Sequence, residues 1–186
     1  TEANLMAFRL ALAFTGKPKL VRFICHFHGW QDHVAFGAKG GYSEGPVPGV
    51  LDGIIENVVL IEPGNEQLMR ETLASRDDIA GVILEPTGAS FGSIPVTRDF
   101  VAALREATTE HGVLLLFDEV VTGFRVSSGG AQAHYGITPD LTSLAKILSG
   151  GLPGGAVCGR ADILELLDVE IADKKGFQKI GHQGTY

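Results

Sequence analysis

Apolar residues recur at helical spacing in several parts of the chain. In residues 2–15 they include Leu5, Phe8 and Leu12, and a Gly-Lys-Pro segment ends the pattern. Another clear pattern begins after Thr97, a residue type that caps helix N-termini, and it ends before a glycine. The predicted helices are 2–15, 66–76, 97–111 and one that starts at Asp162.

Short, continuous apolar runs lie between these helical patterns and are typical of buried strands. Residues 29–53 are rich in Gly and Pro and are predicted to form a long loop, a kind of segment that often carries function. Because strands alternate with helices, the pattern predicts an α/β fold with a mostly parallel sheet and right-handed crossovers. The predicted strands are 20–27, 58–61, 79–84, 113–117, 141–145 and 156–158.

Composition narrows the class of protein. A chain of 186 residues with 45% hydrophobic residues is long enough and apolar enough for one domain with a sizeable core. The net charge of −7, without a basic block, argues against nucleic-acid binding, and no stretch predicts a membrane span or a signal peptide. Two distant cysteines, Cys25 and Cys158, fit a reducing cytoplasm. The chain starts without Met and ends without a closing helix, so we expect it to be part of a longer chain.

Lys146 and Asp118 suggest a chemistry. Lys146 lies in an apolar segment that a glycine-rich run at 149–156 follows, and a lysine there is costly unless its amine is used. Asp118 follows an apolar run, at the end of a strand where open α/β sheets place ligand contacts. The pair predicts a lysine that forms a Schiff base with an aldehyde cofactor and an aspartate that holds the ring nitrogen protonated, as in pyridoxal-phosphate enzymes.

Each of these residues also has other interpretations. The run that ends in Asp118 and Glu119 resembles a Walker B strand of a nucleotide hydrolase, but that interpretation requires a GxxxxGK[ST] phosphate loop, which the chain lacks. Asp118 would otherwise only cap a strand end. Lys146 would otherwise be a surface lysine with a snorkelling stem.

Four side chains near the first predicted strand form a possible metal cluster: His26, His28, Asp32 and His33. His26 and His28 are predicted to share one strand face, yet aromatic residues interleave and no complete ligand set follows, so we expect no metal site. Phe27 is a candidate aromatic plate for a flat ring, or else a core residue.

Two further charged residues have open roles. Arg125 is a candidate for binding a substrate carboxylate, or for tying its loop to Asp118 or Glu119. Glu85 ends a predicted strand before a proline; it either balances such an arginine or is a strand-end acid exposed to water.

Taken together, these segments resemble the class III aminotransferases, which are fold-type I pyridoxal-phosphate enzymes. Residues 129–132 (Gly-Gly-Ala-Gln), with Tyr135 and Gly136, resemble most closely the glutamate-1-semialdehyde 2,1-aminomutase branch, although that branch usually has Tyr-His-Gly-His at 27–30. The segments that carry the resemblance are 1–4 (Thr-Glu-Ala-Asn), 27–30 (Phe-His-Gly-Trp), 85–86 (Glu-Pro), 118–125 (Asp-Glu-Val-Val-Thr-Gly-Phe-Arg), 138–141 (Thr-Pro-Asp-Leu), Lys146, 150–156 (Gly-Gly-Leu-Pro-Gly-Gly-Ala) and 184–186 (Gly-Thr-Tyr).

The resemblance implies a partial large, cofactor-binding domain over 1–186, with helices on both faces of the sheet; the family's N-terminal segment and C-terminal small domain are absent. It implies transamination of an amino acid or amine against a keto or aldehyde substrate, in a cytoplasmic homodimer. The alternative is an aminomutase, which moves the amino group within one substrate. A relative without catalytic activity is disfavoured, because Lys146 and Asp118 are both present.

The resemblance also assigns roles to residues by position. Lys146 would carry the cofactor as a Schiff base and shuttle a proton, and Asp118 would pair with the pyridine nitrogen. Val120 and Phe27 would pack on the two faces of the ring. Thr1 would contact the phosphate, and Thr185 would reach the phosphate of the neighbouring subunit. The cofactor-binding set implied is Thr1, Phe27, His28, Glu85, Asp118, Val120, Lys146 and Thr185.

Overall fold

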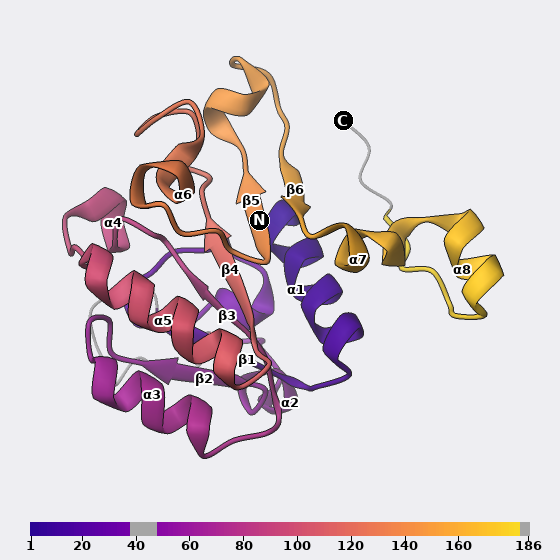
Figure 1. Ribbon diagram of the computed structural model, residues 1–186, viewed down its shortest axis with the longest axis horizontal. Helices are drawn as coiled ribbons and strands as arrows, with labels where there is room; N and C mark the ends of the chain where they lie inside the picture. Colours follow the sequence, from indigo (N-terminus) through magenta and orange to yellow (C-terminus); the bar gives the residue numbers. More distant parts are fainter. Residues whose placement is uncertain (38–47, 183–186) are drawn as a thin grey trace.

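Within residues 1–37 and 48–182, which the structure describes, the computed structural model has one six-stranded sheet with the strand order β2-β1-β3-β4-β5-β6 (Figure 1). Every neighbouring pair is parallel except β5 and β6, which are antiparallel. The strands are β1 (Lys19–Phe23), β2 (Val58–Ile61), β3 (Ile79–Leu84), β4 (Leu114–Asp118), β5 (Leu141–Leu144) and β6 (Ala156–Gly159).

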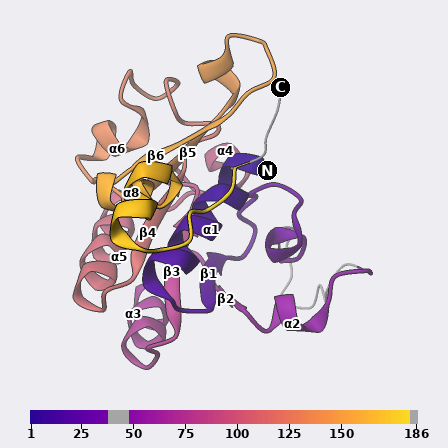
Figure 2. The same ribbon diagram turned by 90° about the vertical axis from the view of Figure 1, so that its right-hand side faces the viewer.

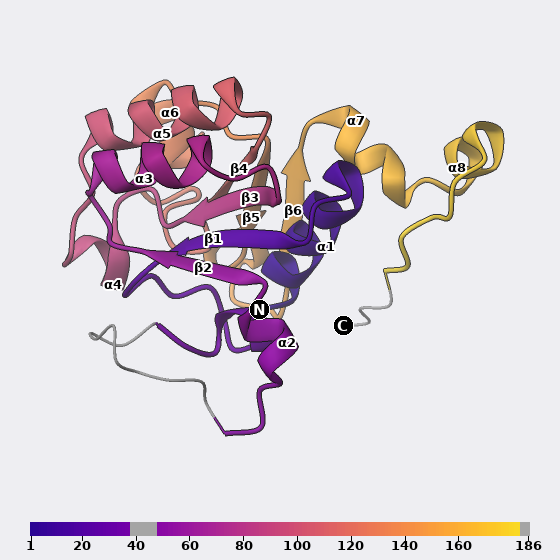
Figure 3. The ribbon, with the colours of Figure 1, turned by 90° about the horizontal axis from the view of Figure 1, so that it is seen from below.

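Helices cover both faces of this sheet, as Figures 2 and 3 show. On one face lies α1 (Glu2–Thr15), which contacts β3, β5, β6 and α7 (Ala161–Leu164). On the other face lie α3 (Glu66–Ala74) and α5 (Arg98–Glu110), which pack against each other. The predicted α/β fold, with a mostly parallel sheet and helices on both faces, is confirmed.

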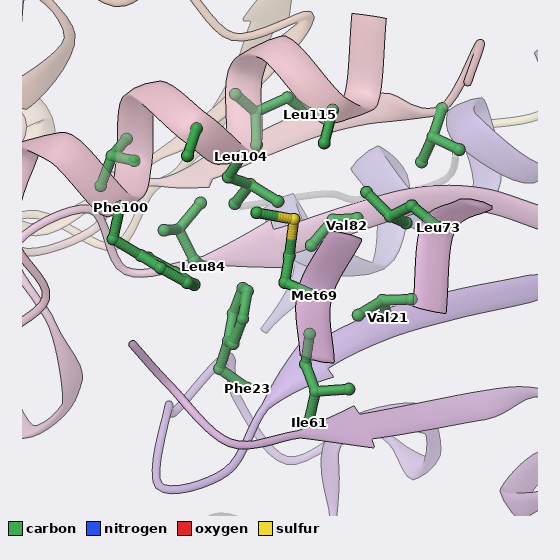
Figure 4. Packing of buried hydrophobic residues seen from close by; sticks show 14 of the residues in the cluster. Val21, Phe23, Ile61, Met69, Leu73, Val82, Leu84, Phe100, Leu104 and Leu115 are labelled. Carbon is green, nitrogen blue, oxygen red and sulfur yellow. The ribbon is translucent and has the colours of Figure 1, made fainter. Parts of the chain in front are cut away.

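The core has one layer on each face because successive side chains of a strand point to opposite sides. Under α3 and α5, Met69 and Leu73 meet Phe100, Leu104 and the strand side chains that point their way (Figure 4). On the other face, Leu20 and Ile83 pack with apolar residues of α1. Burial on both faces explains why the strands are continuous apolar runs.

Several short elements complete the fold. They are the 3-10 helices η1 (Asp32–Val34), η2 (Lys146–Ser149) and η3 (Glu165–Leu167), and the helices α2 (Asp52–Ile55), α4 (Ala89–Gly92), α6 (Gly130–Tyr135) and α8 (Val169–Lys175). The sequence pattern predicts none of α2, α4 and α6. Residues 38–47, in the middle of the predicted loop 29–53, lie outside the described part.

Two predicted elements differ from the structure. The strand predicted over 20–27 is wrong at its end: β1 stops at Phe23, and Cys25 has a left-handed backbone with φ of 69° that no strand tolerates. The expectation that His26 and His28 share a strand face is therefore also wrong. The helix predicted from Asp162 is divided into α7, η3 and α8, because Asp168 caps a new helix by accepting hydrogen bonds from the backbone N–H groups of Glu170 and Ile171.

The order of the strands indicates where a ligand can bind. The next strand along the chain after β1 is β2, which lies on one side of β1, and the strand after that is β3, which lies on the other side. The direction of winding therefore reverses at β1. Open α/β sheets bind ligands beyond the carboxyl ends of the strands that flank such a reversal. None of the helices in the described residues has the length and apolar character needed to cross a membrane.

Candidate active site

A cavity of about 750 Å³ lies at the carboxyl ends of β1, β3, β4 and β5, next to the N-terminus of α1. Four strands thus each deliver side chains to one place, although these residues are far apart in the sequence. The lining residues are Thr1, Asn4, Cys25, Phe27, His28, Gly29, Trp30, Val34, Ala35, Phe36, Glu85, Ser90, Asp118, Val120, Val121 and Lys146.

Asp118 is the last residue of β4 and is buried at the floor of this cavity. Its Oδ2 accepts a hydrogen bond from Asn4 Nδ2 at 2.8 Å and lies 2.8 Å from His28 Nδ1. Its Oδ1 accepts from the backbone N–H of Val120 at 3.1 Å. Burial alone would raise the pKa of Asp118, but these donors, His28 foremost, outweigh it and hold the pKa below its ordinary value. Asp118 is therefore a buried carboxylate that stays ionised.

Glu85, directly after β3, lines the same cavity and behaves in the opposite way. Its residue is only 7% exposed, and its Oε1 accepts a hydrogen bond from the backbone N–H of Phe27 at 2.8 Å. Burial raises the pKa of Glu85 to about 7, and the nearby Asp118 charge adds to the rise. The interpretation of Glu85 as a strand-end acid exposed to water is wrong.

Lys146 follows β5 as the first residue of η2, and it lines the same cavity as Asp118. Its backbone has φ of 49°, a left-handed conformation that is uncommon for a residue with a side chain. Such conformations gather at functional sites, where the surrounding structure holds them in place. The ammonium lowers the pKa of Glu85 from across the cavity, so the two side chains face a common space.

The walls suit a flat ring with an anionic tail. Val120 and Phe27 both line the cavity, and Phe27 is 62% exposed, so the interpretation of Phe27 as a core residue is wrong. Thr1 is the N-cap of α1, a 14-residue helix whose positive end favours anions such as phosphate. A Cβ on Gly29 would lie 2.6 Å from Thr1 Oγ1, so only glycine lets the two segments approach this closely.

Glu119 holds the loop that follows β4. It is buried and accepts hydrogen bonds from the Thr122 hydroxyl at 2.8 Å and from the backbone N–H of Ala131, the second residue of α6, at 2.5 Å. The expectation that Arg125 ties this loop to Asp118 or Glu119 is wrong, because Arg125 Nε donates to the backbone carbonyl of Val121 at 3.1 Å. Its alternative role, binding a substrate carboxylate, stays a prediction.

The structure brings together seven of the eight predicted cofactor residues. Thr1, Phe27, His28, Glu85, Asp118, Val120 and Lys146 line the cavity, whereas Thr185 lies outside the described residues. In residues 1–37 and 48–182, no group of three or more His, Cys, Asp or Glu side chains is placed to hold a metal ion.

Sequence reasoning missed three residues that shape the site: Asn4, His26 and Glu119. Asn4 binds Asp118 directly, and its position one helical turn after the N-cap of α1 was the available signal. His26 accepts a hydrogen bond from the backbone N–H of Glu85 at 2.9 Å, which no local pattern announces. Glu119 belongs to the Asp-Glu pair after β4, but its partners lie in a helix that the pattern does not predict.

Comparison with known proteins gives consistent matches. The model of the family described as Aminotransferase class-III matches residues 1–186. A glutamate-1-semialdehyde 2,1-aminomutase from Natranaerobius thermophilus is 45% identical over 171 residues, which are 90% of this chain and 40% of that protein. The chain thus spans about 40% of the length of the curated relatives it matches.

Solved structures show the same fold. A structure described as a transaminase with PLP bound superimposes with a TM-score of 0.89 at 32% identity, covering 100% of this chain and 43% of that one. A β-phenylalanine aminotransferase from Variovorax paradoxus superimposes with a TM-score of 0.80 at 35% identity, covering 98% of this chain and 39% of that one.

Proposed function

Because the chain belongs to the class III aminotransferases, a family of enzymes, we propose that the whole protein uses pyridoxal phosphate to move an amino group, with Lys146 as the lysine that bonds the cofactor. One observation carries the proposal: a buried carboxylate held ionised, Asp118, shares a cavity with Lys146. We propose further that this chain is part of the large domain of a subunit in a cytoplasmic homodimer. In this proposal the site is completed by three other parts of the protein: the rest of the large domain, an N-terminal segment and a small domain.

The residues present fit this cofactor. Asp118 offers an anion for a protonated ring nitrogen, Val120 and Phe27 offer apolar faces for the ring, and Thr1 with the N-terminus of α1 offers donors for a phosphate. His28 and Glu85 also line the cavity. Thr185 is proposed to serve the phosphate bound by the neighbouring subunit. When bound, pyridoxal phosphate supplies an aldehyde for the amine and a ring that accepts electrons.

The chain's own groups supply orientation and proton transfer. Asp118 stays ionised and favours the protonated form of a ring nitrogen placed against it. With the cofactor bound, Lys146 Nζ would be the amine in the cavity that could take a proton from the substrate carbon and return it to another carbon. The substrates are therefore small amino and keto or aldehyde compounds.

Two forms of amino transfer remain. The resemblance by itself favours transamination between two substrates, with the aminomutase as the alternative. The curated relatives support the aminomutase better, since proteins of that name are 40–46% identical to the chain. We therefore propose intramolecular transfer first. The apolar wall of Phe27, Trp30 and Phe36, together with the likeness to a β-phenylalanine aminotransferase, favours intermolecular transamination as the second candidate.

A substrate experiment tests this proposal. The whole protein, loaded with pyridoxal phosphate, is given glutamate-1-semialdehyde alone, and in parallel an aromatic amino acid with a keto acid. Isomerisation of the single substrate supports the aminomutase, and a new pair of amino and keto products supports the transaminase. Absence of cofactor-dependent amino transfer across a broad panel of donors and acceptors would contradict both. Lys146→Ala is the matched control in each reaction.

A further inference from the structure

Two neighbouring histidines are buried beside Asp118: His28 contacts the carboxylate directly, and His26 lies next to His28. His26 and His28 are both buried, with 0% and 1% exposure, and their ring centroids lie 6.0 Å apart. His28 lines the cavity, whereas His26 does not. The proposed function uses Asp118 and leaves His26 without a role.

The hydrogen bonds of His26 define its tautomer. Its Nδ1 accepts from the backbone N–H of Glu85 at 2.9 Å, so Nδ1 carries no proton and the neutral ring must carry its proton on Nε2. That Nε2–H group is buried and has no hydrogen-bond partner among the described residues. Burial lowers the pKa of His26 to about 3, so the ring is neutral at ordinary pH.

His28 has the complementary arrangement. Its Nδ1 lies 2.8 Å from Asp118 Oδ2, and an ionised carboxylate only accepts, so Nδ1–H is the donor. Burial lowers the pKa of His28 despite the Asp118 charge, which leaves a lone pair on Nε2. This Nε2 is also buried, again without a partner in the part of the chain that the structure describes. Adjacent rings thus carry one buried donor that lacks an acceptor and one buried acceptor that lacks a donor, an expensive combination unless they satisfy each other.

We propose that His26 is a positioning residue whose Nε2–H donates through one buried water to His28 Nε2, and so supports the His28 tautomer that donates to Asp118. The result is a chain of donors that runs from the Glu85 backbone N–H through His26 and His28 to Asp118. Each donor polarises the next, and all of them stabilise the carboxylate. A bridging water would have a donor on one side, His26 Nε2–H, and an acceptor on the other, His28 Nε2.

The proposal explains why a second histidine is useful. Without His26, Asp118 alone keeps the proton on His28 Nδ1, and His28 Nε2 is left without a donor to orient the ring. A less well oriented His28 weakens the hydrogen bond that lowers the pKa of Asp118 most. Asn4 Nδ2 and the Val120 N–H remain, so the carboxylate is weakened as a partner for a cation and does not lose all its support.

The first test reads the tautomers directly. Histidine-selective ¹⁵N NMR on the cofactor-free whole protein should show His26 protonated on Nε2 and His28 protonated on Nδ1, both without titration between pH 6 and 8. The proposal is overturned if His28 carries its proton on Nε2, or if either ring is charged at pH 7. This measurement needs no cofactor, so its result does not depend on the proposed function. Only the role of Asp118 as the partner of a ring nitrogen rests on that function.

The second test uses substitutions in the whole protein. His26→Leu removes the donor while filling the space beside Phe23, and we expect it to shift the His28 nitrogen resonances and to weaken pyridoxal-phosphate binding on the order of tenfold. His26→Gln keeps an acceptor for Glu85 N–H and a donor for His28, so affinity should return to within roughly threefold of the parent. His33→Leu, at a half-buried histidine that bonds Gln31, is the matched control and should change neither. The proposal fails if His26→Leu leaves the His28 resonances unchanged, or if His26→Gln behaves like His26→Leu.

Discussion

Asp118 and Glu85 are two carboxyl groups in one cavity, and their surroundings move their pKa values in opposite directions. Among the described residues, Asp118 accepts from three donors, whereas Glu85 accepts from the backbone N–H of Phe27. The difference separates their roles: one group keeps a permanent negative charge, and the other changes charge near neutral pH.

Asp118→Asn should separate charge from shape. The amide has nearly the same size but no charge, so it no longer favours a protonated ring nitrogen. We expect cofactor to remain bound and turnover to fall by about 10²-fold or more, which is about 2.7 kcal/mol of barrier. Single-turnover absorbance measurements with the whole protein check this, and a near-normal rate would remove Asp118 from the proposed role.

Glu85→Gln should change stability in a pH-dependent way. The pKa of Glu85 is raised from its ordinary value of 4.5 to about 7 in the fold, so ionisation in the folded state is unfavourable. The penalty is absent below pH 4.5, grows as the pH rises toward 7 and is complete above it. Glutamine avoids that penalty and still accepts from Phe27 N–H. At pH 8 the free energy of unfolding of the cofactor-free variant should therefore exceed that of the parent by about 1–2 kcal/mol, which raises its unfolding midpoint, whereas at about pH 4.5 the two midpoints should coincide. Equal midpoints at pH 8 would contradict the raised pKa.

At the scale of elements, Asp140 connects one helix and two strands through hydrogen bonds. Its Oδ2 accepts from Arg105 Nη1 at 2.9 Å and from the Leu115 backbone N–H at 2.8 Å, and its Oδ1 accepts from Arg160 Nη1 at 3.0 Å. These donors come from α5, β4 and the residue after β6, so a single carboxylate fixes the start of β5 against its neighbours.

Asp140→Ala should therefore destabilise the fold strongly. It leaves one buried N–H and two guanidinium groups without their shared acceptor, at an expected cost of about 2–4 kcal/mol. Asp162→Ala is the matched control, because it removes an exposed partner of Arg160 that is worth about 1 kcal/mol or less. Thermal unfolding of both variants in the whole protein tests the difference. Equal losses would mean that the Asp140 cluster has no special structural role.

The elements also show what the sequence could predict. Strands β2 and β3 and the helix capped by Thr97 follow from local pattern, because their apolar runs and caps act within a few residues. The end of β1 could not be predicted, since the left-handed turn at Cys25 is held by its backbone hydrogen bond to Gly37, a contact outside any local window. Lys146 and Asp118 stood out by their contrast with apolar neighbours. Asn4 did not, and His26 stood out only as a possible metal ligand, because only folding brings Asn4 to Asp118 and His26 to the Glu85 backbone.

At the scale of the whole molecule, two apolar side chains that line the cavity are exposed to solvent. Trp30 is 81% exposed and Phe27 is 62% exposed. Exposed apolar groups near one site mark a surface that a partner covers. This agrees with the proposed homodimer, in which each subunit completes the other's site.

Mixed dimers test that arrangement. We expect Lys146→Ala and Thr185→Ala each to be impaired as homodimers of the whole protein. If Thr185 serves the neighbouring site, a heterodimer of the two variants holds one site with both lesions and one with neither, so activity returns to about half of the parent. Heterodimers verified by native mass spectrometry that show no recovery would place Thr185 outside the partner's site.

The central claim is that Lys146 bonds the cofactor in the cavity that Asp118 closes. The most direct measurement is borohydride reduction of the whole protein loaded with pyridoxal phosphate, followed by peptide mapping by mass spectrometry. We predict a single modified lysine, Lys146, and loss of both the modification and the visible absorbance band in Lys146→Ala. A reduced adduct at any other lysine of the parent protein, with Lys146 unmodified, would contradict the claim.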